Sequence, residues 1–197
     1  NTEAPELVSV KVDESLAALG GAQGDGIASA ILLGATVQAQ FASVYGADGA
    51  GSTVYSLVLT GSGVPSGLHA VDPNAALGKG AEILLSQSGS VITGSVGGHD
   101  YFTLTIDPSS GAVTLNLLDN LWHGNTGSND DAVALQLPAE VLKLVQTLTD
   151  GDGDSDSVFI DLGAAGVFSF EDDGPKAQRN TEAPELVSVK VDESLAA

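Results

Sequence analysis

Residues 91–118 read VITGSVGGHDYFTLTIDPSSGAVTLNLL, and this stretch decides the predicted fold. Apolar and β-branched residues run through Val91–Val96, Tyr101–Ile106 and Ala112–Leu118, and the runs are separated by a Gly-Gly pair and by DPSSG. Short apolar runs separated by such turn residues every 8–12 residues are typical of a sandwich or barrel, and not of alternating strands and helices. The stretch therefore predicts an all-β fold.

Further apolar or alternating runs lie on both sides of this stretch, and we expect each to form a strand. They are Leu7–Val12, Val37–Tyr45, Thr53–Thr60, Ala81–Leu85, Leu137–Leu148, Ser157–Leu162 and Gly166–Phe170. The run Leu137–Leu148 also fits one face of a helix with Pro138 in its first turn, but its strand-rich surroundings favour a strand. Together the runs predict an antiparallel β-sandwich.

The composition limits the partners of the chain. The 197 residues suffice for one domain with a hydrophobic core, and the net charge is −20. Such a surface is a poor partner for nucleic acid or anionic lipid, and no apolar run is long enough to insert into a membrane. There is no cysteine, so no disulfide can form. The uncompensated negative charge favours bound cations.

The chain ends as it begins. Asn1–Ala18, NTEAPELVSVKVDESLAA, stands again letter for letter at Asn180–Ala197, 179 residues later. An exact repeat of this length indicates a tandem array. We expect residues 1–175 to form one module, and residues 176–197 to hold a linker and the first strand of the next module. With no initiating Met and no signal peptide, we expect an internal segment of a longer chain.

One acidic segment is the first candidate for a metal site. TDGDGDSDS, at residues 149–157, contains four aspartates spaced two apart: Asp150, Asp152, Asp154 and Asp156. Several carboxylates without cysteine or histidine favour Ca²⁺ over zinc, copper or Mg²⁺. The start of the segment resembles an EF-hand loop. However, Ser155 and Asp161 replace its usual Gly and Glu, and a strand-like run follows, so an EF-hand is not expected.

A second acidic group stands at the predicted junction between modules. It comprises Glu171, Asp172 and Asp173 after the last strand, the pair Asp13 and Glu14 after the first strand, and its copy Asp192 and Glu193. If modules stack end to end, these acids and the aspartate-rich loop could meet at one end of a module, where Ca²⁺ would stiffen the linker.

Other residues carry weaker signals. Asp48 and Asn129-Asp130-Asp131 fit turns as well as ligands, and Gly24-Asp25-Gly26 is one imperfect match to a calcium β-roll turn, so a loop is preferred. His69, His99 and His123 have no metal-ligand spacing, and we expect them to be surface or packing residues. No nucleophile motif and no aromatic-rich cleft indicates a hydrolase, so we expect no enzyme.

Five motifs in this order, VDES, YGADGAGSTVYSLVL, NDDAVAL, LTDGDGDSDS and FSFEDDGP, resemble the repeat modules of giant RTX-type bacterial adhesins exported by type I secretion. The resemblance implies an Ig- or cadherin-like β-sandwich extender module in an extracellular biofilm adhesin on the bacterial surface. It implies Ca²⁺ at the linkers, with Asp13, Glu14, Asp150, Asp152, Asp154, Glu171, Asp172 and Asp173 as ligands. A chain exported unfolded benefits from having no disulfides and can fold on meeting external calcium.

From these observations we expect a non-catalytic, calcium-rigidified spacer whose partners are the neighbouring tandem repeats of the same chain. The alternative is a module that itself binds carbohydrate or another surface polymer.

Overall fold

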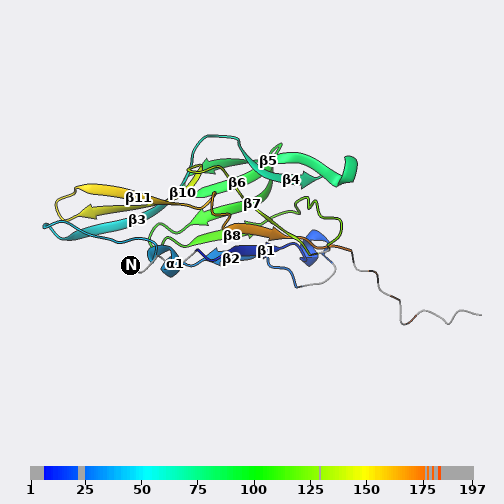
Figure 1. Cartoon of the computed structure of the whole chain (residues 1–197), viewed down its shortest axis with the longest axis horizontal. Coiled ribbons are helices and arrows are strands. Elements are labelled where there is room, and N and C mark those ends of the chain that lie inside the picture. The colour runs from blue at the N-terminus through cyan, green and yellow to red at the C-terminus, as the bar shows by residue number, and fades with distance from the viewer. Residues whose placement is uncertain are drawn as a thin grey trace, which may run out of the picture.

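Strands are the main regular structure in the computed structural model, which describes residues 7–21, 25–128 and 130–175, with Ala177, Arg179 and Glu182 (Figure 1). The strands are β1 (Val10–Asp13), β2 (Ser29–Leu32), β3 (Ala50–Leu59), β4 (Val64–Val71), β5 (Lys79–Ser88), β6 (Val91–Val96), β7 (His99–Ile106), β8 (Val113–Leu117), β9 (Ala132–Ala134), β10 (Leu142–Asp150), β11 (Ser155–Asp161) and β12 (Phe168–Glu171). The short helical turns are η1 (Ala17–Leu19), α1 (Gly34–Gln38) and η2 (Ala76–Gly78). The predicted all-β sandwich is confirmed.

One layer is a six-stranded antiparallel sheet in the order β2-β8-β7-β6-β5-β4. Its centre is the stretch at residues 91–118, which forms β6, β7 and β8 as predicted. Along β7 the side chains alternate, so that Phe102, Leu104 and Ile106 are buried while the residues between them are partly exposed. Because alternate side chains of a strand lie on opposite faces of the sheet, one face of the sheet packs against the core.

The opposing layer consists of two three-stranded sheets, β1-β12-β9 and β11-β10-β3. Strands β1 and β12 pair in parallel, from Val10 with Phe168 to Asp13 with Glu171, and are the exception to the antiparallel prediction. Because the paired strands run the same way, their carboxyl ends lie side by side. The first strand of the repeat thus ends where the last one ends.

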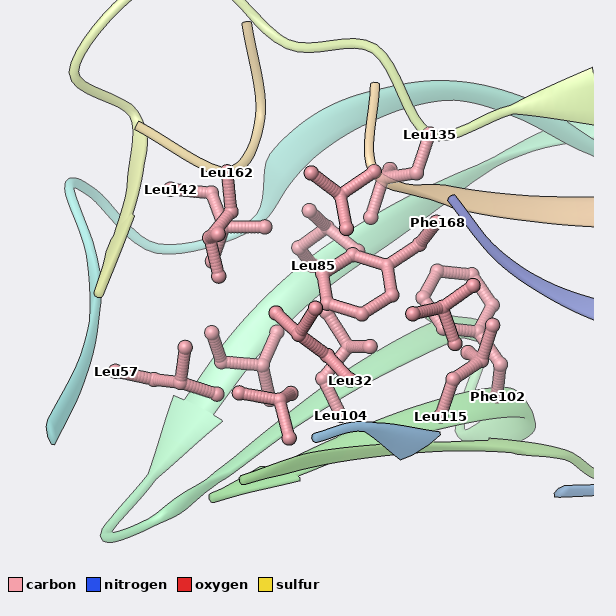
Figure 2. Close-up of a cluster of buried hydrophobic side chains, with 14 of the residues drawn as sticks. Leu32, Leu57, Leu85, Phe102, Leu104, Leu115, Leu135, Leu142, Leu162 and Phe168 are labelled. Atoms are coloured by element: carbon pink, nitrogen blue, oxygen red, sulfur yellow. The ribbon is translucent and has the colours of Figure 1, made fainter. Parts of the chain in front are cut away.

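Both layers share one hydrophobic core (Figure 2). The largest fully buried side chains come from both layers: Leu32, Ile83, Leu85, Ile92, Phe102, Leu104, Leu115, Leu135, Leu142, Leu144, Phe168 and Phe170. The rings of Phe102 and Phe170 lie 4.8 Å apart between their centroids, so β12 is anchored directly against the six-stranded sheet.

One strand prediction needs correction, and one alternative is resolved. The run Val37–Tyr45 was expected to be a strand, but residues 34–38 form the helix α1 and residues 41–46 lie in no strand. Its residues do not alternate in burial, because only Val37 is fully buried, and β3 pairs instead with β10. The helical alternative for Leu137–Leu148 is wrong, since β10 begins at Leu142 and alternates in burial. Strands β2, β4 and β9 were not predicted; β4 contains Pro65 and Gly67 and pairs with register shifts.

The two ends of the repeat lie far apart (Figure 1). The distal part of the β3-β10-β11 sheet, residues 46–54 and 148–158, extends beyond the sandwich on the side where β1 begins, and we call it the arm. Strand β12 leads the chain out at the opposite end. Residues 151–159 of the arm are exposed. The predicted first strand of the next repeat, with Asp192 and Glu193, lies outside the described residues.

Candidate metal centre

The parallel ends of β1 and β12 bring the first predicted acids together. The Glu14 N–H donates to the Glu171 carbonyl at 3.0 Å, and the Ser15 hydroxyl donates to Asp173 Oδ1 at 3.3 Å. Asp13 Oδ1 accepts the Ser15 N–H at 2.8 Å. Residues about 160 positions apart in sequence therefore share one strand-end site, as the prediction of a common junction required.

Two further segments complete this site with carboxylates. The loop after η1 returns to Ser15, where the Gly26 N–H donates to the Ser15 carbonyl at 3.2 Å. A Cβ on Gly26 would lie 2.5 Å from the Ser15 carbonyl carbon, so only glycine permits this close approach. The approach places the adjacent Asp25 at the strand-end site. The Asp172 N–H donates to the Asp131 carbonyl at 2.9 Å and so draws in the segment before β9.

The result is a pocket of about 270 Å³, which we call the junction pocket. It is lined by Asp13, Ser15, Asp25, Asp130, Asp172, Asp173 and Gly174. Ca²⁺ prefers six to eight oxygen ligands in a flexible arrangement. Five carboxylates and a hydroxyl from four separate segments line this pocket, and oxygen donors of this kind are chemically suited to Ca²⁺.

Behind the junction pocket lies a second, buried group of ionisable residues, which we call the inner cluster: Glu14, His123, Asp131 and Asp172. The side chains of Glu14 and His123 are only 4% and 3% exposed. Glu14 Oε1 accepts the Leu121 N–H at 2.8 Å and lies 3.3 Å from His123 Nε2. His123 Nδ1 lies 3.6 Å from Asp131 Oδ2. An imidazole is thus held between carboxylates in a water-poor environment.

The ionisation of the inner cluster reflects this burial. Desolvation raises the pKa of Glu14 and that of Asp172, because a buried carboxylate loses its hydration. Burial opposes the charged form of His123, but its hydrogen bond to Glu14 and the charges of Glu14, Asp172 and Asp131 outweigh this and raise its pKa. The cluster therefore favours the presence of a cation among the carboxylates.

The tip of the arm carries a separate acidic group. Asp48, Asp150 and Asp152 each offer one carboxylate oxygen, and these oxygens lie within 4.8 Å of one another. Hydrogen bonding with Asp152, and then the N–H groups of Asp154 and Gly153, lower the pKa of Asp150. A Cβ on Gly151 would lie 2.4 Å from the Asp48 carbonyl oxygen, so glycine lets the two tip loops close on each other.

The structure places the junction pocket and the arm tip at opposite ends of the repeat (Figure 1). The linker acids and Asp13 lie together, but the expectation that the aspartate-rich loop joins them at one end of a single module is wrong. The physical reason is the length of the β10-β11 hairpin, which carries its turn away from the strand ends of β1 and β12.

The comparisons with known proteins give one result. The model of a family described as a domain of unknown function, DUF5801, matches residues 9–163. The chain belongs to the DUF5801 family. Neither the curated proteins nor the solved structures contain a match. The match runs from β1 through β11 and so includes Asp13, Glu14, His123 and the arm, and it ends before β12.

The remaining predicted ligands of this DUF5801 domain occupy other positions. Glu171 forms an ion pair with Lys11, and this bond raises the pKa of Lys11. Asp154 and Asp156 lie on the arm beside Asp150, where they line a shallow pocket with Val44 and Tyr45. The weaker candidates Asp48, Asp130 and Asp131 all lie at or beside an acidic group, in addition to their turn roles.

Sequence reasoning missed His123 and Asp25 as site residues of the DUF5801 domain. No other histidine stands at ligand spacing from His123, and its partner Glu14 lies 109 positions away. Asp25 was noticed only within an imperfect glycine-rich turn. His99 is exposed and paired with Asp119 at 2.6 Å, as expected for a surface histidine. Across the described part of the chain, no helix is both long and apolar enough to span a membrane.

Proposed function

We propose that this DUF5801 domain is a non-catalytic spacer repeat, rigidified by calcium, in a long adhesin on the bacterial cell surface. Its role would be to project distal ligand-binding domains away from the cell. The observation that carries the proposal is the placement of acidic groups at both ends of a unit whose opening sequence recurs after 179 residues.

The direction of the chain supports this proposal. Strand β1 begins on the side toward which the arm extends, and β12 ends at the junction pocket on the other side. In a tandem array the junction pocket of one repeat therefore faces the beginning of the next. The arm of that next repeat extends back toward the same junction. Two acidic groups that are separated within one repeat would approach each other between consecutive repeats.

A shared ion would have a mechanical effect. Eleven residues, 175–185, separate Gly174 from Leu186, the second copy of Leu7. A chain of eleven residues can reach up to roughly 40 Å, so its length alone does not fix the relative orientation of two repeats. Divalent ions between the junction pocket and the arm tip would lower the repulsion of a chain with net charge −20 and fix the relative orientation of the repeats.

The test uses two consecutive repeats in one chain, with calcium and with a chelator. We expect calcium to raise the melting temperature and to increase the maximum dimension measured by small-angle X-ray scattering. Two double variants, Asp172→Asn with Asp173→Asn and Asp150→Asn with Asp152→Asn, should each reduce the calcium-dependent extension. Glu140→Gln, an exposed substitution that removes one negative charge outside both acidic groups, is the control.

Unchanged melting and unchanged dimensions on chelation would overturn the spacer proposal. The alternative, a carbohydrate-binding module, calls for an exposed aromatic platform. Trp122 is a poor candidate for one, because Leu77 accepts its indole N–H at 2.8 Å and Lys79 Nζ lies 4.9 Å from its ring centroid. Reproducible binding of one repeat to a glycan array in calcium would favour that alternative.

A further inference from the structure

We infer that Glu14, His123 and Asp172 form a second metal site inside the domain, and that it takes a borderline divalent metal of the zinc class in preference to Ca²⁺. The inference does not depend on the spacer proposal. The two sites share the side chain of Asp172, but the inner one is built around an imidazole nitrogen, which the junction pocket does not contain.

The first observation is the convergence of three different ligand atoms. One nitrogen of His123 and one oxygen each of Glu14 and Asp172 lie within 4.8 Å of one another. Two ligands held at about 2.0–2.1 Å in tetrahedral geometry lie roughly 3.3 Å apart. The separation of His123 Nε2 and Glu14 Oε1 is 3.3 Å. The pair is therefore already spaced as two ligands of one small ion.

The second observation is independent of the acidic residues. The His123 side chain is 97% buried, since only 3% is exposed, yet its Nδ1 has no hydrogen-bond partner among the described residues. Asp131 Oδ1 and Asn120 Oδ1 are buried without partners in the same part of the chain. Leaving buried polar atoms unpaired is unfavourable, so such a group points to a bound species that organises it.

A metal on Nε2 would account for this arrangement. Ligation at Nε2 places the ring proton on Nδ1, and Nδ1 lies 3.6 Å from Asp131 Oδ2. Histidine ligands commonly donate the second ring N–H to a carboxylate, which orients the ring and strengthens the ligand. Asp131 is thus the positioning residue, and Glu14, His123 and Asp172 are the ligands. The Leu121 N–H, which donates to Glu14 Oε1, orients the first carboxylate in the same way.

The choice of metal follows from the donors. Imidazole with two carboxylates suits zinc and neighbouring transition metals, whereas Ca²⁺ selects oxygen. Two carboxylates and one divalent ion are also neutral together, which removes the cost of an uncompensated charge on the buried Glu14. Glu14 and Asp172 line a second pocket with Gly20, Gly21 and Asn120, which supplies an entry path and room for a water ligand.

The experiment titrates the whole, chelator-stripped chain with ZnCl₂ in saturating calcium, by calorimetry and by nitrogen NMR of the histidine rings. We expect one zinc equivalent to bind and to shift the ring signals of His123 alone. His123→Gln and Asp172→Asn should each abolish this binding, and Asp131→Asn should weaken it by about 10- to 100-fold. His99→Gln, which removes an exposed histidine paired with Asp119, is the matched control.

Two results would overturn the inference. They are unshifted His123 ring signals in the wild-type chain in saturating calcium, and zinc binding by His123→Gln equal to that of the wild type. The wild-type NMR shift decides the matter even if a variant does not fold. If the chain binds zinc but its length does not change with calcium, only the spacer proposal is refuted. If its length changes with calcium but zinc does not bind at His123, only the inner metal site is refuted.

Discussion

Breaking the contact between Glu14 and His123 is the most informative perturbation of the metal-free domain. His123 Nε2 and Glu14 Oε1 lie 3.3 Å apart and both side chains are nearly inaccessible. At an effective dielectric constant of about 20, opposite unit charges at that distance attract by about 5 kcal/mol. Desolvation offsets part of this attraction. Either side chain can also lose its charge, by releasing or binding a proton, when its partner is removed. We therefore expect each of Glu14→Gln and His123→Gln to cost about 2–3 kcal/mol.

The assay is a double-mutant cycle in chelator at neutral pH, measured by urea unfolding and by thermal melting. Each single variant should lower the melting temperature by roughly 5–10 °C in a domain of this size. The double variant should lose less than the sum, with a coupling of about 2 kcal/mol. The exposed pair His99 and Asp119, changed to Gln and Asn, should couple by less than about 1 kcal/mol. Equal coupling in the two pairs would refute the reasoning.

Three further predictions concern the core, one turn and the arm. Phe170→Ala should cost about 3–5 kcal/mol in urea unfolding, because the ring is fully buried against Phe102; a loss below 1 kcal/mol would contradict the packing. The pKa of Asp107 is about 2, lowered by the Ser109 hydroxyl and N–H and by the Ser110 hydroxyl. Its stabilising effect is present above its ordinary pKa of 3.8 and is lost as pH falls toward 2. The difference in unfolding free energy between the wild type and Asp107→Asn should therefore shrink over that interval. A constant difference would show that the hydrogen bonds to the Asp107 carboxylate do not stabilise the fold. Gly151→Ala should force the tip loops apart and weaken calcium binding there, whereas Gly46→Ala, whose Cβ would meet nothing closer than 3.8 Å, should not.

The strands and one acidic loop could be predicted from the sequence because their signals are local. Alternating apolar residues between turn sequences predicted β6 without error and β7 and β8 within two residues. The spacing of Asp150 and Asp152 was enough to predict that their carboxylates lie close together. The strand prediction for Val37–Tyr45 failed because apolar composition alone does not give the direction of each side chain, and only Val37 in this run is fully buried.

The sequence by itself determined the all-β class, the exact repeat and the abundance of carboxylates, because each of these is a property of neighbouring residues or of the whole composition. The tertiary structure alone decided which carboxylates meet. Parallel pairing of β1 with β12 joins Asp13 to Asp173, and the segment after β8 brings His123 to Glu14. The length of the β10-β11 hairpin separates Asp150 from both groups. These contacts depend on strand order and hairpin length, which follow from packing the core and not from any local pattern.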